Sequence, residues 1–99
     1  PSYALKIYKT RYSSNANVKV YVVSSESAAD LVVYKCDYSS QAQGKEAIWY
    51  FVRYSSNANV KVYFTRYSSQ ADLKIYYTRY SSKAGWKRNH RLRGRLNRG

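Results

Sequence analysis

The lysines and arginines of this chain are the residues whose type and spacing most clearly indicate a function, which is the binding of an anion. Of its 99 residues, 18 are Lys or Arg and 5 are Asp or Glu, so the formal net charge is +13. This charge repels itself in a compact fold, and an anionic partner would relieve the repulsion. Regularly spaced cations suit a phosphate backbone, which releases condensed counterions when it is neutralised. We therefore expect the partner to be a polyanion, with RNA as the leading candidate.

The densest cationic segment is KRNHRLRGRLNRG, at residues 87–99, which holds six basic residues and no acidic one. With two glycines and two leucines, it predicts a disordered tail that folds on its partner. Arginine makes bidentate phosphate contacts and stacks on bases, which favours RNA. A solubilising or membrane-attracted tail is the alternative. The expected RNA contacts of the tail are Lys87, Arg88, Arg91, Arg93, Arg95 and Arg98.

A second set of cations recurs at thirteen-residue intervals in the body of the chain. Stacked strands lie about 4.8 Å apart, so aligned units would bring these cations into rows of like charge, which repel one another. A phosphate backbone running beside such a row would stabilise it. The alternative is a solvated surface that blocks edge pairing. The predicted secondary patch consists of Lys61, Arg66, Lys74 and Arg79.

The sequence offers no constellation for catalysis or for metal or cofactor binding. One cysteine and one histidine, Cys36 and His90, form neither a zinc site nor a nucleophile–base pair. The repeated serines lack the partners of a catalytic triad. Cys36 shares a repeat column with Thr and Val, so we expect it to be a packing residue. We therefore expect no enzyme, no metal, no cofactor and no small-molecule substrate.

Cysteine usage and hydropathy bear on the compartment. A single cysteine excludes an internal disulfide framework and is typical of a reducing, cytoplasmic location. No apolar run approaches the roughly 18 residues that a membrane span needs. We therefore expect a cytoplasmic protein with no membrane partner.

The cations in the body of the chain are positioned by a thirteen-residue repeat. Six units cover residues 6–86, from KIYKTRYSSNANV to KIYYTRYSSKAGW, with three extra residues within Lys45 to Ile48. The positions that vary least between units are three, five, seven, nine, eleven and thirteen. All are odd-numbered, and this period of two is typical of an extended chain with one face turned inward. Strand formers fill the first half of each unit and turn formers the second. Each unit therefore predicts one strand of about six or seven residues and one turn.

The repeat allows two all-β architectures. Each unit could be one coil of a β-solenoid, or one strand of an antiparallel meander or up-and-down barrel. Alanine at the eleventh position of all six units favours the solenoid, because a coil needs a small inward residue where a surface hairpin does not. We predict a tandem-repeat β domain over residues 1–86, forming a small β-solenoid, and a disordered basic RNA-binding tail over residues 87–99.

Tyrosine fills two columns of the repeat, the third position in all six units and the seventh in five. Tyrosine rings can stack on bases. Because both columns are odd-numbered and so belong to the face expected to turn inward, ladders of core residues are the favoured interpretation. Phe64 and Tyr77 occupy the even fourth position, so we expect them to face outward.

Written as (I/V)YxTxYSSxAD, the body resembles a family of short, basic bacterial proteins built from tandem VYxTxYxSxAD units. The KAGW step at Lys83 to Trp86, followed by basic residues, is similar to that family's ending. The chain also resembles lineage-specific accessory proteins of the large ribosomal subunit. This resemblance implies a structural ribosome constituent whose tail lies on ribosomal RNA, beside neighbouring ribosomal proteins. A protein-interaction or surface scaffold is the main alternative, and an ice- or glycan-binding solenoid is a second.

Overall fold

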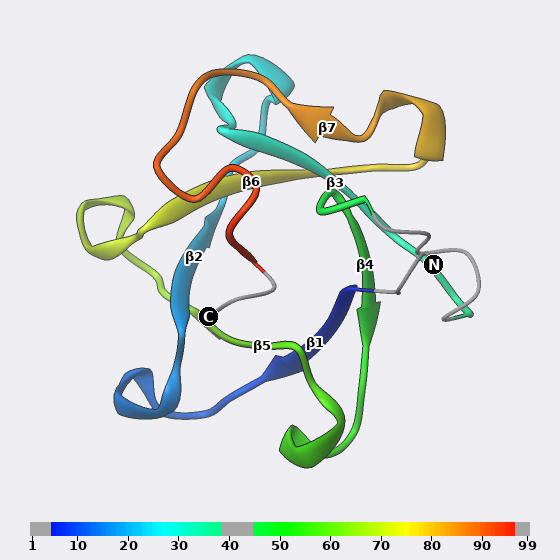
Figure 1. The fold of residues 1–99 in the computed structure, drawn as a ribbon. Helices are drawn as coiled ribbons and strands as arrows, with labels where there is room; N and C mark the ends of the chain where they lie inside the picture. Colours follow the sequence, from blue (N-terminus) through cyan, green and yellow to red (C-terminus); the bar gives the residue numbers. More distant parts are fainter. Residues whose placement is uncertain (1–4, 39–44, 97–99) are drawn as a thin grey trace.

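The computed structural model describes residues 5–38 and 45–96, which form an all-β fold with six strands closed into a parallel barrel (Figure 1). Each repeat unit supplies one strand, and five units also supply a short 3-10 turn, as the repeat predicts. The barrel strands are β1 (Leu5–Lys9), β2 (Val18–Val22), β3 (Leu31–Lys35), β4 (Ile48–Phe51), β5 (Val60–Phe64) and β6 (Leu73–Thr78). A short β7 (Gly85–Trp86) follows them, and the turns are η1 (Ser13–Asn15), η2 (Glu26–Ala28), η4 (Ser55–Asn57), η5 (Ser68–Gln70) and η6 (Ser81–Lys83).

The strands are interleaved around the barrel. Their order is β1-β5-β2-β6-β3-β4, β4 pairs back to β1, and every pairing in this ring is parallel. The chain thus circles the barrel twice, and β4, β5 and β6 of the second circuit lie between the strands of the first. The β7 strand adds to β3 in the antiparallel direction. The predicted β-solenoid is therefore wrong, and so is the antiparallel meander, because apart from β3 and β4 no two successive barrel strands pair.

Each short connection arches over the outside of the strand that it skips (Figure 1). Between β1 and β2, the N–H of Thr10 donates to the carbonyl of Val62 at 2.9 Å, on one edge of β5. On the other edge, the N–H of Asn17 donates to the carbonyl of Lys61 at 2.8 Å. A crossing this short leaves no room for the helix that usually joins parallel strands.

The twelfth residue of the unit, always Asn or Asp in these crossings, fixes each arch to the strand below it. Its backbone N–H donates to the carbonyl of a lysine on that strand, and its side-chain oxygen accepts from the N–H of the same lysine. One residue thereby extends the backbone ladder on both sides. The side-chain bonds are Lys6 N to Asn59 Oδ1 at 2.7 Å, Lys61 N to Asn17 Oδ1 at 2.8 Å, Lys19 N to Asp72 Oδ2 at 2.9 Å and Lys74 N to Asp30 Oδ2 at 3.0 Å.

The barrel interior is filled by the thirteenth position of one unit and the second position of the next, which are two residues apart along a strand. Their side chains are at most 5% exposed. The expectation that the tyrosines of the third and seventh positions face inward is wrong. The third-position tyrosines are half-buried on the outer wall, and the seventh-position tyrosines are 61–68% exposed. The interior residues are Leu5, Ile7, Val18, Val20, Leu31, Val33, Ala47, Trp49, Val60, Val62, Leu73 and Ile75.

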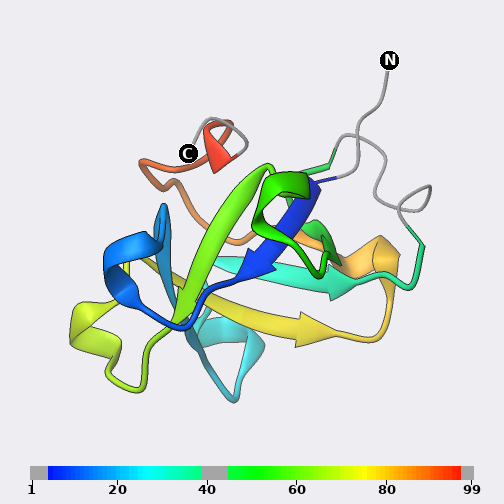
Figure 2. The ribbon, with the colours of Figure 1, turned by 90° about the horizontal axis from the view of Figure 1, so that it is seen from below.

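The C-terminal segment lies across the end of the barrel where the strands begin (Figure 2). Leu96 is 2% exposed within the core, and Leu92 packs against it. The carboxylate of Glu46 accepts the N–H groups of Gly94 and Leu96 at 2.6 and 3.0 Å. The predicted disorder is therefore wrong for residues 87–96, because the leucines close the barrel and an acid from the three-residue insertion holds their backbone.

Candidate functional site

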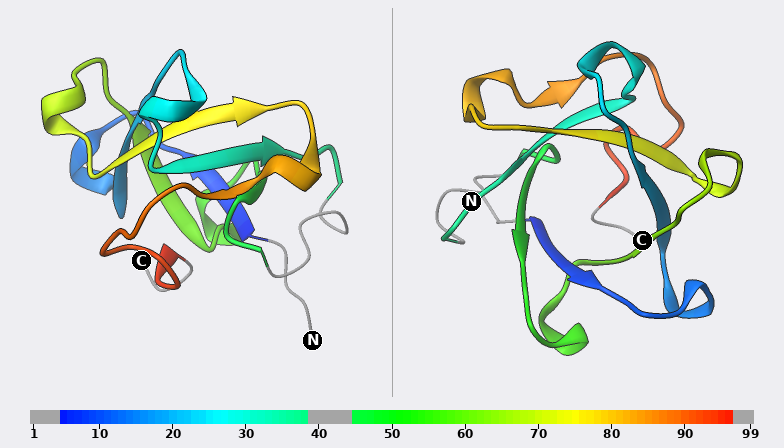
Figure 3. Two further views of the ribbon diagram at one scale, coloured as in Figure 1. Left: turned by 90° about the horizontal axis from the view of Figure 1, so that it is seen from above. Right: turned by 180° about the vertical axis from the view of Figure 1, so that it is seen from behind.

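The end of the barrel where the strands finish is built by the fourth position of the repeat. Because the six strands are parallel, these residues form a ring at one end, opposite the C-terminal segment (Figure 3). The ring lines a cavity of about 700 Å³, which we call the mouth. Phe64 and Tyr77 face into it, so the expectation that they point outward is wrong. The ring comprises Lys9, Val22, Lys35, Phe51, Phe64 and Tyr77, and Tyr8, Val52 and Arg53 complete the lining.

Aromatic rings and ammonium groups are paired in the mouth. The Nζ atom of Lys9 lies 5.3 Å from the centroid of the Phe64 ring, and the Nζ atom of Lys35 lies 5.3 Å from that of Phe51. The two phenylalanine rings are 6.4 Å apart and tilted by 30°. Burial raises the pKa of the Tyr77 hydroxyl to about 12, so this group stays a neutral donor at physiological pH. The mouth therefore combines an apolar aromatic floor with positive charge, and its lining contains no carboxylate.

Four units place an Arg–Tyr pair directly after the strand, around the same end of the barrel as the mouth. We call these pairs the Arg–Tyr rim. Each tyrosine precedes a 3-10 turn, and in three of the pairs its N–H donates to a threonine hydroxyl two residues earlier, at 3.2–3.5 Å. These bonds fix where the chain leaves the strand and keep the ring in solvent. The pairs are Arg11–Tyr12, Arg53–Tyr54, Arg66–Tyr67 and Arg79–Tyr80.

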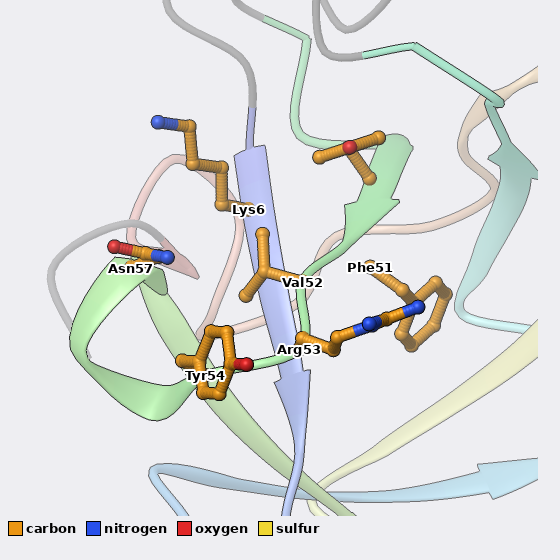
Figure 4. A pocket seen from close by; sticks show the side chains of 7 residues that line it. Lys6, Phe51, Val52, Arg53, Tyr54 and Asn57 are labelled. Carbon is orange, nitrogen blue, oxygen red and sulfur yellow. The ribbon is translucent and has the colours of Figure 1, made fainter.

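One rim pair is shown at close range in Figure 4, beside a hollow of about 550 Å³. The side chain of Arg53 extends towards Phe51 and the mouth, whereas Tyr54 lies on the other side of β1, on the side of the turn that carries Asn57. Lys6 of the skipped strand lines the same hollow. An arch therefore brings together a lysine, an arginine and a tyrosine from two strands that are distant in sequence.

The predicted secondary patch is dispersed around the barrel. Arg66 and Arg79 belong to the Arg–Tyr rim, Lys61 lies on β5 beneath the arch that carries Arg11–Tyr12, and Lys74 lies on β6. The expected rows of like charge do not form between neighbouring strands. The register places Lys61 beside Tyr8 and Lys74 beside Tyr21, so each lysine is next to a tyrosine.

Half of the predicted tail contacts are ion-paired within the chain. Lys87 Nζ lies 3.4 Å from Glu26, Arg88 Nε lies 3.6 Å from Asp30, and Arg91 Nη2 lies 3.1 Å from Asp72. The Glu26 and Asp72 carboxylates are 44% and 37% exposed, so their ion pairs are of the weak surface kind, whereas the Asp30 carboxylate is 14% exposed. Arg93 and Arg95 are exposed and have no ion pair within residues 5–38 and 45–96, and Arg98 lies outside the described residues.

Sequence reasoning did not assign the mouth, although a signal for it exists. The thirteenth, second and fourth positions share one parity when the alternation is counted across the unit boundary. Lys9 and Lys35 occupy the same column as Phe51 and Phe64, an unusual mixture for either a core or a plain surface. Reading that column as inward would have revealed a charged aromatic ring.

Residues 5–38 and 45–96 contain no group of three or more His, Cys, Asp or Glu side chains that could hold a metal ion. Within the same ranges, no helix has the length and hydropathy required to cross a membrane.

Comparison with known proteins identifies a family through the repeat. The family model of the 7(1) septoil knot domain matches residues 4–87, which include all six units. No curated protein and no solved structure gives a significant match. The match agrees with the expected tandem-repeat family, and the interleaved double circuit suits a domain described as a knot. The chain belongs to the family of 7(1) septoil knot domains.

Proposed function

We propose that this protein binds RNA as a structural constituent of a ribonucleoprotein, with the Arg–Tyr rim as its principal contact surface. The observation that carries the proposal is the composition of that rim: four of the six barrel strands are each followed by an arginine and an exposed tyrosine at the same end of the barrel. The four ion pairs found within residues 5–38 and 45–96 all involve the C-terminal segment, and none involves a rim arginine.

The chemistry of the rim suits RNA with unstacked bases. Arginine contacts phosphates in a bidentate manner, and tyrosine stacks on any base through its ring face. Proteins recognise RNA mainly at loops and bulges whose bases are splayed out. Separate, exposed aromatic side chains match such irregular surfaces better than they match the groove of a regular duplex.

The C-terminal segment would provide a second contact at the opposite end of the barrel. Arg93 and Arg95 are exposed there, and Arg88 and Arg91 could exchange their carboxylate partners for phosphates. Cationic surfaces at both ends suit a protein embedded between RNA segments. The large ribosomal subunit is the assembly to which the sequence resemblance points, and it would place the protein in the cytoplasm.

The test compares two variants with the same loss of charge. Arg11, Arg66 and Arg79 are changed to alanine in the rim variant. In the comparison variant Lys45, Lys74 and Lys87, which lie outside the rim, are changed to alanine; Lys74 and Lys87 are two of the contacts that the sequence predicts, so the pair of variants weighs the rim against them. Fluorescence anisotropy measures binding to a labelled RNA hairpin with a single-stranded loop over a range of salt concentrations. If each rim arginine neutralises one phosphate, the dependence of log K on log salt should flatten by about 2–3 in the rim variant. Equal affinity losses in both variants would reject the rim as the binding surface.

A further inference from the structure

RNA binding by the Arg–Tyr rim leaves the mouth without a role. Its volume, about 700 Å³, lies within the range of roughly 300–1,000 Å³ found for small-ligand sites. Phe51 and Phe64 are only partly buried in it, and Val22 is 42% exposed. Apolar side chains gathered in a concave, solvent-facing position are typical of a ligand site.

The depth of the mouth limits what can enter. Directly beneath the fourth-position ring lies the fully buried ring of second-position side chains, among them Trp49, Val62 and Ile75. Trp49 meets Phe51 edge to face, with centroids 6.2 Å apart. A long alkyl chain would need a tunnel through this layer, which is closed. The cavity is therefore suited to a short, flat group.

The charges of the mouth identify the rest of the ligand. Lys9, Lys35 and Arg53 line the cavity, and none of its lining residues is acidic. The two ammonium groups are held above the phenylalanine rings, from which they can turn to an anion at the opening. The neutral hydroxyl of Tyr77 adds a hydrogen-bond donor to the wall. A flat ring joined to an anionic group satisfies all of these features.

We propose that the mouth binds a single unstacked nucleotide, with its base against Phe51 and Phe64 and its phosphate held by Lys9 and Lys35. This inference rests on the proposed RNA-binding function and adds to it a pocket that takes one base out of the RNA strand. The rim then holds the neighbouring phosphates and bases. Stacking on the phenylalanine rings tolerates any base, so the pocket selects an unstacked nucleotide over a paired one.

Mononucleotides test the pocket directly, because they are too small to engage the rim as a whole. Adenosine monophosphate, adenosine and inorganic phosphate are titrated separately into the isotope-labelled full chain, and backbone amide resonances are followed by NMR. The nucleotide should bind saturably and shift the amides of Lys9, Phe51 and Phe64, at least tenfold more tightly than either the nucleoside or phosphate. Equal affinity for phosphate alone, or shifts confined to the rim and the C-terminal segment, would overturn the proposal.

Variants connect the pocket to RNA binding. The double variant Lys9→Ala, Lys35→Ala is compared with Lys45→Ala, Lys74→Ala, which removes the same charge elsewhere. Phe64→Leu removes the ring face but keeps an apolar side chain, so it tests stacking with little risk to the fold. Nucleotide affinity should fall at least fivefold in Phe64→Leu and in the lysine double variant, and stay within twofold of the parent protein in the control.

The two proposals can fail separately. If the nucleotide does not bind the mouth and the rim variant still lowers RNA affinity, the pocket is wrong and the proposed function remains. If the nucleotide binds the mouth but the rim variant binds RNA as its charge-matched control does, the pocket stands and the proposed RNA surface is wrong.

Discussion

Replacing Glu46 should release the C-terminal segment from the barrel. Its carboxylate accepts three N–H groups: Trp86 Nε1 at 3.0 Å, the Gly94 amide at 2.6 Å and the Leu96 amide at 3.0 Å. All three groups belong to the last part of the described chain. Glu46→Ala removes these bonds but leaves the Glu46 carbonyl, which accepts from Trp49 Nε1.

The size of the effect follows from the hydrogen bonds and from Leu96. A hydrogen bond to a charged group contributes about 1.5–3 kcal/mol, and partial exposure of Glu46 reduces each to about 1 kcal/mol because water can replace the carboxylate. Losing the burial of Leu96 would add up to about 1.5–3 kcal/mol if the segment detaches. We expect Glu46→Ala to lower the free energy of unfolding by about 3 kcal/mol if the segment stays in place and by up to about 6 kcal/mol if it detaches.

Urea unfolding followed by tryptophan fluorescence measures this loss, and hydrogen exchange locates it. The amides of Gly94 and Leu96 should lose protection in Glu46→Ala while those of the barrel strands keep it. Glu26→Ala is the matched control, because Glu26 makes one exposed ion pair with Lys87 at 3.4 Å and should contribute less than about 1 kcal/mol. A Glu46→Ala variant as stable as Glu26→Ala would refute the proposed role of this carboxylate.

Three further predictions concern titration, reactivity and folding. Burial raises the pKa of Tyr77 from 10.0 to about 12, so the folded state holds this proton more tightly than the unfolded state. Stability should therefore fall as pH rises from 10 towards 12, less steeply in Tyr77→Phe, and NMR of ring-labelled tyrosine should show one late-titrating signal that this variant lacks. Burial also raises the pKa of the Cys36 thiol, which is 4% exposed, so its reaction with a disulfide reagent should be at least about tenfold slower than in urea; equal rates would contradict the packing role. Apart from β3 and β4, barrel strands that pair come from segments 44 or 53 residues apart, so refolding after urea dilution should take seconds or longer, and millisecond refolding would contradict the interleaved order.

Read locally, the sequence predicts each element but not the order in which the strands pair. Strand formers and turn formers divide every unit in the same way, and the strands and 3-10 turns follow this division. Because the units are alike, a strand such as β1 has the same complementarity to β2 as to β5. The lengths of the arches and the Asn or Asp at the twelfth position select the interleaved order, and both resemble ordinary turn features when read locally.

The candidate site can be predicted only in part from the sequence, for the same reason. The charge and the Arg–Tyr pairs are evident in the sequence, but the direction of each column depends on where the alternation is counted from. Counting from the third position placed Tyr12 inside and Phe64 outside, whereas both are the other way round. The tail was misjudged because two leucines are too few to form a core of their own, yet they suffice to complete one that the barrel supplies.

The central claim is that RNA meets the protein at the Arg–Tyr rim and the mouth. Ultraviolet cross-linking of the native particle in cell lysate, followed by mass spectrometry of the linked peptides, tests it directly, because it joins bases to aromatic side chains in contact. The account predicts cross-links at Tyr12, Tyr54, Tyr67 and Tyr80, with Phe51 or Phe64 among them. Cross-links confined to residues 87–96, or a complete lack of RNA-linked peptides with the protein bound only to other proteins, would contradict it.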